Sequence, residues 1–296
     1  MIEILKDGEG MIGILCDSGS DLPPELAKID EIEIVPLKLI MGKKEYRETE
    51  ISEKEIVEFM KTGIPRTSLP SYEDVKLGFE RLINRGYKEI IVINISGKLS
   101  GTHNLFKLVG AQILEEIPDL RIEYVDSMTL SGGIALLVEL AVEMIESGMD
   151  IRGIVFQLRK SAMEKLKIFL IVPTLRFLRA GGRISKVSAS IGEALNFKPI
   201  ITMNQEGDLV AIAKARGMKR AVVKLIQKLE EETKGKKLRA AAVYHSGSDK
   251  ETLEYAKKLK EKLLLLGAPK IMERNISSVL LVHAGSGLVG AGVLFM

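Results

Sequence analysis

The sequence has no tryptophan, a single cysteine and only three histidines among its 296 residues. Aromatic residues make up 5% of the chain, which is few for a protein that stacks nucleic-acid bases on exposed rings. The 43 basic and 40 acidic residues leave a net charge of +3, and the two signs are interleaved along the chain. Because no basic stripe forms, we expect no nucleic-acid partner.

The scarcity of cysteine and histidine also limits the cofactor chemistry. The lone thiol, Cys16, cannot form an intramolecular disulfide, and its apolar surroundings predict a small buried strand residue. His103, His245 and His283 are too scattered along the chain to suggest a metal site. The chain also lacks a Walker-type phosphate loop and the Gly-x-Gly-x-x-Gly motif of dinucleotide-binding folds. We therefore predict no metal and no cofactor.

Targeting signals are sparse as well. The chain does not start with a basic segment followed by an apolar one, as a secretory signal does. Residues 276–296 carry no charge other than on His283, and this length could span a bilayer. Serines and four glycines interrupt the stretch, so we predict a buried strand, a turn and a second element there. We expect a cytoplasmic protein without stable membrane insertion, and residues 1–10 have no assigned role.

The first half of the chain alternates strand and helix patterns. Apolar, β-branched runs predict strands at residues 12–15, 33–40, 89–95 and 121–125. Helical spacing predicts helices at residues 51–60, 72–84, 102–116 and 132–147. Ser52 and Glu55 form a capping box at the start of one of them. Alternating strands and helices predict a doubly wound parallel sheet.

Polar loops follow three of the predicted strands. They contain Asp17-Ser18, the segment 96–100 and Asp126-Ser127. Ligands of doubly wound sheets bind at the carboxyl ends of the strands, so we expect these loops to share one edge and to support a site. The two aspartates could equally serve only to hydrogen-bond neighbouring loops.

The pattern changes after about residue 150. Helices are predicted at residues 151–167, 175–181, 218–233 and 250–266, and strands at 169–172, 198–204, 208–215, 238–245 and 278–283. The turn 205–207 between two of the strands indicates a hairpin. We therefore divide the chain into an α/β parallel-sheet domain, residues 1–160, and an α+β domain with a mixed sheet, residues 161–296.

Four segments have compositions typical of a polar ligand site. They are 65–71, which includes Thr67 and Ser68; 96–103, with Ser96, Ser100 and Gly101; 181–185, with Arg183; and 283–287, with His283 and Gly285. Backbone amides at the start of a helix near residue 102 would favour an anion. Turns, helix caps, a helix stop and a buried core histidine explain the same residues without a ligand. Together the segments describe a hydroxyl-rich edge but do not define the anion.

The ordered set of these motifs resembles the DegV family. The matching segments are Asp17-Ser18, Thr67 to Ser71, Ser96 to Thr102, Val125 to Ser127, Leu175 to Ser185, Lys198 to Ile200, Lys214 to Arg216 and His283 to Gly287. Each motif alone is weak, but their order and spacing hold over nearly the whole chain.

The resemblance implies a lipid carrier rather than an enzyme. DegV-like proteins bind a long-chain fatty acid in a tunnel between two domains and present it to a fatty acid kinase, which makes the acyl phosphate. Carried over, Thr67 and either Ser96 or Ser100 would bind the carboxylate, with His283 close by. Arg183 or Arg216 would serve the entrance or the kinase interface. Ser68, Gly101 and Gly285 belong to the same motifs and complete the implied ligand-binding set.

Two other classes of function remain open at this point. Asp17, Ser100 and His283 are the residue types of a hydrolase triad, although no Gly-x-Ser-x-Gly elbow is present. His283 could instead hold a small carbonyl substrate, as in dihydroxyacetone kinases of similar fold. A structural or interaction module without a ligand is the other class; the charged helices would support it, although such helices are more often solvated faces.

Overall fold

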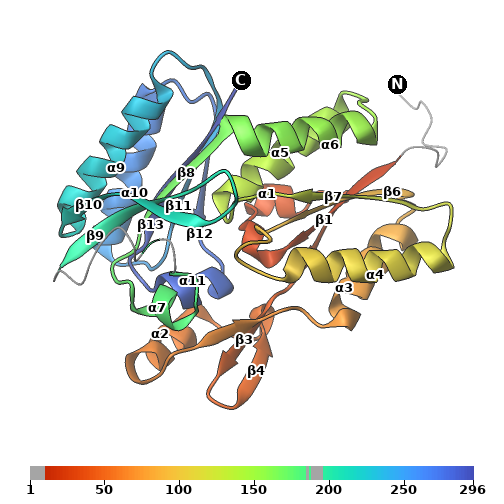
Figure 1. Cartoon of the computed structure of the whole chain (residues 1–296), viewed down its shortest axis with the longest axis horizontal. Coiled ribbons are helices and arrows are strands. Elements are labelled where there is room, and N and C mark those ends of the chain that lie inside the picture. Colours follow the sequence, from red (N-terminus) through yellow and green to blue (C-terminus); the bar gives the residue numbers. More distant parts are fainter. Residues whose placement is uncertain (1–10, 185–186, 188–195) are drawn as a thin grey trace.

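The structure is a computed structural model, which describes residues 11–184, 187 and 196–296. Two large sheets lie beside each other, and a small third sheet extends below them in the view of Figure 1. We call them the parallel sheet, the mixed sheet and the small sheet. Ser185, the last residue of one of the predicted site segments, lies outside the described residues, as do residues 1–10.

The parallel sheet has the order β2-β1-β6-β7, and all of its neighbouring strands run parallel. Its strands are β1 (Ile12–Asp17), β2 (Ile32–Val35), β6 (Glu89–Asn94) and β7 (Arg121–Asp126). Helices α3 (Tyr72–Asn84) and α4 (Thr102–Glu116) cover one face, and α5 (Gly132–Glu146) and α6 (Ile151–Lys160) cover the other.

Residue alternation in the strands explains the two covered faces. Leu15 and Val92 point into the core under α3 and α4, whereas Ile14 and Ile91 point into the core under α5 and α6. Both faces must be apolar when helices cover both, which gives the continuous hydrophobic runs of the sequence. The predicted doubly wound sheet is confirmed.

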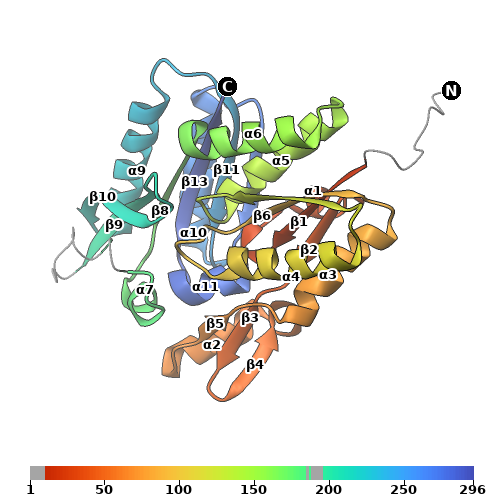
Figure 2. The same ribbon diagram turned by 45° about the vertical axis from the view of Figure 1, so that its right-hand side comes forward.

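The mixed sheet has the order β10-β9-β8-β13-β11-β12. Its strands are β8 (Leu166–Ile171), β9 (Phe197–Met203), β10 (Leu209–Arg216), β11 (Leu238–His245), β12 (Ile271–Asn275) and β13 (Val289–Phe295). Only β11 and β12 pair in parallel, and the other pairs are antiparallel. Helices α9 (Met218–Thr233) and α10 (Lys250–Leu265) pack on one face, as Figure 2 also shows. The predicted β9–β10 hairpin is confirmed, with Gly207 in the turn at φ 84°.

The small sheet consists of β3 (Lys38–Met41) between β4 (Lys44–Arg47) and β5 (Arg66–Ser68). Short elements complete the fold: α1 (Pro24–Ala27), α2 (Glu53–Thr62), α7 (Arg176–Ala180), α11 (Ser278–Ala284), the 3₁₀ turns η1 (Ser18–Ser20) and η2 (Glu48–Glu50), and the π turn η3 (Ser161–Lys165). The capping box of Ser52 and Glu55 opens α2, as predicted.

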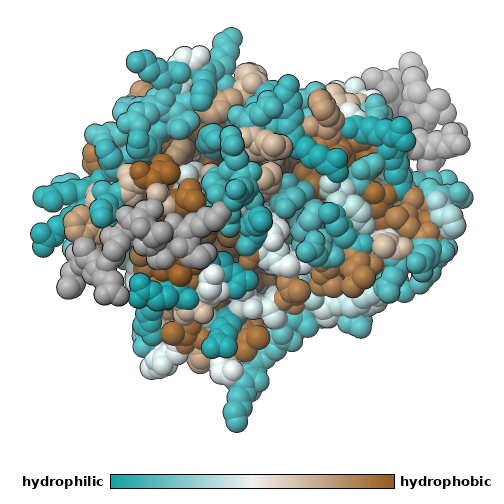
Figure 3. All heavy atoms as spheres, in the orientation of Figure 1, coloured by the Kyte–Doolittle hydropathy of each residue, from teal (hydrophilic) through white to brown (hydrophobic). Residues whose placement is uncertain are grey.

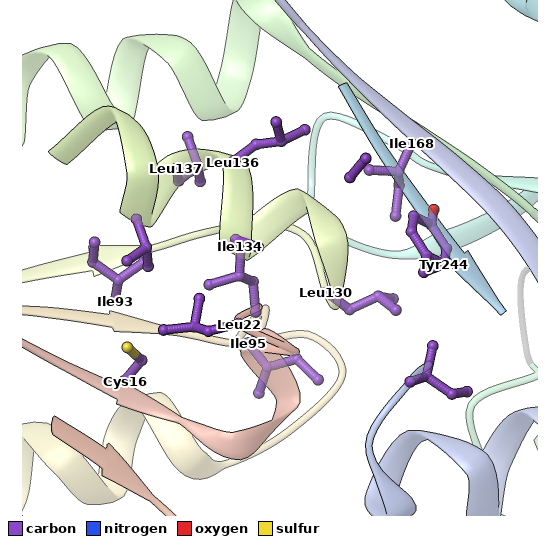
Figure 4. Close-up of a cluster of buried hydrophobic side chains, with 14 of the residues drawn as sticks. Cys16, Leu22, Ile93, Ile95, Leu130, Ile134, Leu136, Leu137, Ile168 and Tyr244 are labelled. Carbon is purple, nitrogen blue, oxygen red and sulfur yellow. The ribbon is translucent and has the colours of Figure 1, made fainter. Parts of the chain in front are cut away.

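Helix α5 joins the two large sheets into one core. It contacts β6 of the parallel sheet and β8, β11 and β13 of the mixed sheet, and most of its residues are buried. Figure 4 shows Ile134, Leu136 and Leu137 of this helix between Ile93 and Ile168, which come from different sheets. A helix that lies between two sheets must be apolar over most of its surface, and α5 is exposed to solvent at Glu143 and Glu146, near its C-terminal end.

One predicted strand, residues 33–40, is in fact two strands in different sheets. Pro36 lies between β2 and β3, and proline has no N–H to donate to a ladder. The next amide, that of Leu37, is bound by the hydroxyl of Ser18 at 3.0 Å instead of by a strand. The chain therefore leaves the parallel sheet at this point and enters the small sheet.

The prediction of a strand at residues 278–283 is wrong, because this segment is helix α11. Gly285 ends the helix at φ 78°, a conformation that favours glycine. Its first amides are bound by distant carboxylates: Asp21 accepts the Ser277 N–H at 2.7 Å and Glu48 accepts the Val279 N–H at 3.3 Å. The element after the turn is the strand β13. Strands β4, β5 and β12 were not predicted either.

The strands of the parallel sheet all precede residue 127 and those of the mixed sheet all follow residue 165. A domain boundary near residue 160 remains a proposal. No helix of the described part of the chain is long and apolar enough to cross a membrane. Hydrophilic residues cover most of the face shown in Figure 3, and hydrophobic residues appear there in separate patches.

Candidate functional site

The predicted polar loops meet at the carboxyl edge of the parallel sheet. The carboxylate of Asp17 at the end of β1 accepts hydrogen bonds from the Ile95 N–H at 2.9 Å and the Asn94 side chain at 3.1 Å. Asp126 at the end of β7 accepts the N–H groups of Gly97 at 3.2 Å and Met128 at 2.9 Å. The prediction that these loops share one edge is confirmed.

The two aspartates and their neighbouring serines hold loops in place. Asp17 is completely buried, and the burial raises the pKa of its carboxyl group. Ser18 accepts the Leu37 N–H, and Ser127 accepts the Thr129 N–H at 3.3 Å. All four of the residues predicted to support the site therefore bond to backbone or side-chain groups of neighbouring loops.

A cavity of about 330 Å³ lies between this edge, the mixed sheet and α11. Such a volume is at the lower end of the range for small-molecule sites. Most of its wall is aliphatic: Leu37, Leu69, Ile95, Leu99, Leu130, Leu170, Val172, Leu178, Leu209, Ile276, Val279, Leu280, Ala284 and Leu288. Its polar wall residues are Thr67, Ser68, Ser100, Ser131, Arg183, Tyr244 and His283. We call this space the apolar cavity.

Thr67 and His283, which are 216 residues apart in sequence, meet in the wall of the apolar cavity. The Thr67 hydroxyl oxygen lies 2.8 Å from Nε2 of His283. Thr67 is on β5 of the small sheet and His283 is in the last turn of α11. We call this end of the cavity the head end.

The imidazole of His283 is uncharged at neutral pH. Burial, with a smaller contribution from the positive charge of Arg183, lowers the pKa of His283 to about 4. Its Nδ1 has no hydrogen-bond partner among the residues that the structure describes. A Cβ atom on Gly181 would lie 2.3 Å from that nitrogen, so only glycine at this position lets the ring approach. Gly181 also ends α7, as the sequence predicted. The same glycine therefore stops a helix and leaves room for the imidazole of His283.

Three more of the predicted ligand-binding residues lie near the head end. The Ser68 hydroxyl donates to Glu45 at 2.6 Å. The Ser100 hydroxyl lies 2.8 Å from that of Thr102, at the start of α4, and Gly101 is the residue that precedes this helix. Gly285, directly after α11, accepts a hydrogen bond from the Ser246 hydroxyl at 2.7 Å and is not in the cavity wall.

Two predicted residues lie elsewhere. Ser96 is buried, donates to the Gly207 carbonyl at 2.7 Å and is not among the residues that line the apolar cavity. Its hydroxyl ties the edge of the parallel sheet to the β9–β10 turn. Arg216 is exposed at the far end of β10, which begins in the cavity wall at Leu209. Arg216 is therefore about 20 Å from Leu209 along the strand.

Arg183 connects the apolar cavity to a second, polar one. Its Nε donates to the Leu99 carbonyl at 3.0 Å, and its side chain lines both spaces. The second cavity has about 320 Å³ and is lined by Gly97, Lys98, Leu99, Ser100, Gly101, Gly182, Arg183, Asp208 and Leu209. Because Leu99, Ser100, Arg183 and Leu209 belong to both walls, the two spaces adjoin at the head end.

The other end of the apolar cavity was not predicted. There the carboxylate of Asp21 accepts hydrogen bonds from the Ser131 hydroxyl and the Ser277 N–H. Burial raises the pKa of Asp21 to about 7. Tyr244 lies nearby, and the negative charge of Asp21 contributes to a raised pKa of its phenol, after burial as the main cause. We call this region the closed end, because its polar groups are bonded to other groups of the protein. Neither Asp21 nor Tyr244 was among the site residues predicted from the sequence.

The hydrolase triad considered from sequence does not assemble. His283 bonds to Thr67, Asp17 bonds to the loop after β6, and Ser100 bonds to Thr102, so no bond joins the three candidate residues. No group of three or more histidine, cysteine or acidic side chains in the described part of the chain could hold a metal ion. Cys16 is buried, and burial raises the pKa of its thiol.

Comparison with known families and proteins adds to this geometry. The family model described as "Uncharacterised protein, DegV family" matches residues 11–295. A DegV domain-containing protein of Clostridium acetobutylicum is 36% identical over 94% of this chain and 97% of its own length. A protein of Thermotoga maritima that is named as a fatty acid-binding protein is 30% identical over 95% of this chain and 97% of its own length.

Solved structures share the fold. A DegV family protein of Thermus thermophilus, described for its fatty acid binding, superposes with a TM-score of 0.86 at 28% identity, covering 96% of this chain and 99% of that one. The Fatty Acid Kinase (Fak) B3 protein of Streptococcus pneumoniae, loaded with linoleic acid, gives a TM-score of 0.82. It covers 96% of this chain and 99% of that one at 24% identity, a likeness of fold alone. Several of these proteins are named for binding a fatty acid rather than for catalysis.

Proposed function

The chain belongs to the DegV family, and from this premise we propose that it binds one long-chain fatty acid in the apolar cavity and presents it to a partner kinase. The observation that carries the proposal is the Thr67–His283 contact at one end of an otherwise aliphatic cavity. An amphiphile with a small polar head and an apolar tail suits such a space. Relatives named for fatty acid binding support this choice of ligand.

The tail would supply most of the affinity. Each methylene group transferred from water into an apolar wall contributes about 0.8 kcal/mol. For a chain of some fourteen methylenes the gross gain is about 11 kcal/mol, of which association and ordering consume several kcal/mol. The aliphatic wall residues from both sheets and α11 provide the surface for this transfer.

The head end would select a carboxylate. We propose that neutral His283 donates its Nε2–H to the Thr67 oxygen, so that the Thr67 hydroxyl hydrogen is free to donate to a carboxylate oxygen. Ser100 lies in the same wall with a hydroxyl, and Arg183 supplies positive charge nearby. Hydrogen bonds to an ionised group are the stronger kind, which favours a carboxylate over an alcohol or an ester. In this geometry Ser100, and not Ser96, would bind the carboxylate, whereas the family resemblance allowed either serine.

The polar cavity beside the head end supports presentation to a partner. It opens next to Ser100 and Arg183 and includes the exposed Lys98, so a carboxylate at the head end would be reached from this side. We propose that a fatty acid kinase phosphorylates the carboxylate there, with Arg183 near the entrance and the exposed Arg216 as a candidate contact for the kinase. Since such a kinase consumes ATP, the proposal locates the pair in the cytoplasm.

Native mass spectrometry tests the binding step. The purified protein is weighed intact, then extracted with organic solvent, and the extract is analysed for fatty acids. We expect about one fatty acid per chain, and extracted protein should take up palmitate or oleate again. Protein that arrives without lipid and stays empty in the presence of both acids would refute the proposal.

A coupled assay tests presentation. Loaded protein is mixed with ATP and a fatty acid kinase from a bacterium that contains DegV proteins, and acyl phosphate is trapped with hydroxylamine. Product should form with the loaded carrier and not with the kinase and free fatty acid alone. Binding without any product in this assay would leave a carrier without the proposed kinase role.

A further inference from the structure

The apolar cavity has two ends that lie at opposite ends of α11. His283, which contacts Thr67, is in the last turn of this helix, whereas the N–H of Ser277 at its start is bound by Asp21. A helix of seven residues is about 10 Å long. The head end and the closed end are therefore separated by roughly this distance along the cavity wall. A fatty acid whose carboxylate is at Thr67 points its tail toward Asp21, Ser131 and Tyr244.

Tyr244 forms part of the wall at the closed end. It comes from β11, which lies between β13 and β12 in the mixed sheet; its side chain is 1% exposed, and it is one of the largest fully buried side chains. Figure 4 shows its ring on the side of the mixed sheet, facing Leu130 across the space, with the hydroxyl oxygen on the far side of the ring from Leu130. The part of Tyr244 that a tail would meet is thus the carbon ring.

The ring of Tyr244 is held between two glycines. A Cβ atom on Gly290, its partner across the β11–β13 pair, would lie 2.2 Å from the ring, and one on Gly132 would lie 2.8 Å from it. Only the absence of side chains at these two positions allows the ring to occupy this place. The neighbours leave it no room to move sideways.

The hydroxyl fixes the ring along its length. It donates to the carbonyl oxygen of Phe169 at 3.1 Å and lies 3.4 Å from that of Ala291, both on strands of the same sheet. A buried hydroxyl that gives up such a bond loses its only compensation for leaving water. Tilting the ring out of the way of a longer tail would break this contact, so Tyr244 acts as a rigid stop.

We propose that Tyr244 sets the length of the acyl chain that the cavity accepts. This inference rests on the proposed function and goes beyond it by naming a residue that determines specificity. A tail that reaches the ring gains from each methylene it buries, about fourfold in affinity per group. A longer tail finds no space beyond the ring, so its additional methylenes stay in water, or its head leaves Thr67. Affinity should therefore rise with chain length and then stop rising at a defined length.

The test measures dissociation constants for a series of saturated fatty acids from hexanoic to arachidic acid, for the wild-type chain and for Tyr244→Leu. The substitution removes most of the ring and opens the space between Gly132 and Gly290. We expect the length at which affinity stops rising to move to longer acids, with about fourfold tighter binding for each methylene that enters the new space. Short acids that do not reach the ring should bind with unchanged affinity.

Tyr244→Phe is the second variant, because it removes one atom and preserves the core. Its ring has lost the bond to Phe169 and can tilt, so discrimination against the first over-long acid should weaken. Tyr255→Leu is the matched control: this tyrosine is also buried, but it belongs to α10, which packs on the opposite face of the mixed sheet. Its profile of affinity against chain length should equal that of the wild type.

The outcomes separate this inference from the proposed function. If wild type and variants all bind fatty acids with the same dependence on chain length, Tyr244 is not the stop. If the control moves the profile as much as the Tyr244 variants do, a general loss of core packing explains the effect and the inference fails. If wild type binds no acid of the series, it is the proposed function that fails.

Discussion

The head end and the closed end of the apolar cavity contain similar side chains but use their polar groups differently. At the closed end the Ser131 hydroxyl donates a hydrogen bond to Asp21, and the Tyr244 hydroxyl donates one to a main-chain carbonyl. At the head end Thr67 has one partner, His283, and Nδ1 of that histidine has none among the described residues. Polar groups whose bonds are completed by the protein stabilise the fold, whereas groups with spare capacity can serve a ligand.

This comparison predicts opposite consequences of substitution at the two ends. Removal of the polar groups of Asp21 or Ser131 at the closed end should lower the free energy of unfolding and leave the hydrogen bonds to the carboxylate unchanged. Removal of the Thr67 hydroxyl at the head end should weaken the binding of fatty acid and leave the free energy of unfolding nearly unchanged. Each of the following experiments can contradict that distinction or make it quantitative.

The largest effect is expected for Asp21→Ala. The change leaves the Ser277 N–H and the Ser131 hydroxyl without their acceptor in a buried place, which we expect to lower the free energy of unfolding by about 3 kcal/mol. Urea denaturation measures it. Asp119→Ala, at an exposed position, is the control and should change stability by less than about 0.5 kcal/mol. Equal stability of the two variants would mean that Asp21 does not hold α11.

The next effect concerns the affinity for fatty acid. Thr67→Val keeps the shape of the side chain and removes the hydroxyl, and we expect palmitate to bind about 30-fold more weakly, since a hydrogen bond to a charged group contributes about 2 kcal/mol. Ser131→Ala removes a hydroxyl from the same cavity at the closed end and should leave the affinity within about twofold while lowering stability. A weaker affinity in Ser131→Ala than in Thr67→Val would contradict the assignment of the two ends.

The two ends should also respond to pH in opposite directions. The pKa of Asp21 is raised to about 7, so between pH 4 and 7 the folded chain keeps a proton that the unfolded chain has lost, and this group's contribution to stability falls as pH rises. The pKa of His283 is lowered to about 4, so between pH 4 and 6.5 the unfolded chain holds the additional proton, and stability rises with pH.

Single variants should separate these two contributions. Relative to the wild type, Asp21→Asn should show a more positive slope of unfolding free energy against pH in this interval, and His283→Gln a more negative one, each by about 1 kcal/mol per pH unit. Urea denaturation of the ligand-free chains at several pH values measures both slopes. Two variants that change the slope in the same direction would show that one of the two groups has been assigned the wrong environment.

The smallest effect is expected for Ser96→Ala. Its hydroxyl is bound to the Gly207 carbonyl outside the wall of the apolar cavity, so we expect a loss of about 1 kcal/mol in stability and an affinity for palmitate within about twofold of the wild type. Ser100→Ala is the matched variant inside the wall, and it should weaken binding more. The reverse order would assign the carboxylate contact to Ser96.

Much of the fold could be predicted from local patterns. The strands and helices of the parallel sheet have long periodic runs, and helix α3 and α4 begin and end where the sequence indicates. The prediction was wrong where a short apolar run is compatible with either structure. Residues 278–283 have the composition of a strand, but Asp21 and Glu48, more than 200 positions away, bind the first amides of α11 and complete a helix.

The residues of the candidate site were likewise predicted only in part. Thr67, Ser100 and His283 stood out because their segments combine hydroxyls, glycines and turns in an order that resembles the DegV family. Tyr244 and Asp21 gave no comparable signal, since a tyrosine in an apolar strand and an aspartate in a polar loop are ordinary residues. Their positions at the closed end depend on which strands pair and on where α11 lies.

The sequence by itself determined the class of the fold, the polar edge of the parallel sheet and the residue types available for an anionic head. These properties follow from local periodicity and composition, which act over a few residues of the chain. Long-range packing specifies which hydroxyl faces the cavity, which polar groups lie at each of its ends and where α11 forms. Those outcomes depend on contacts between residues distant in sequence, such as Thr67 with His283 and Asp21 with Ser277, whose partners no local pattern specifies.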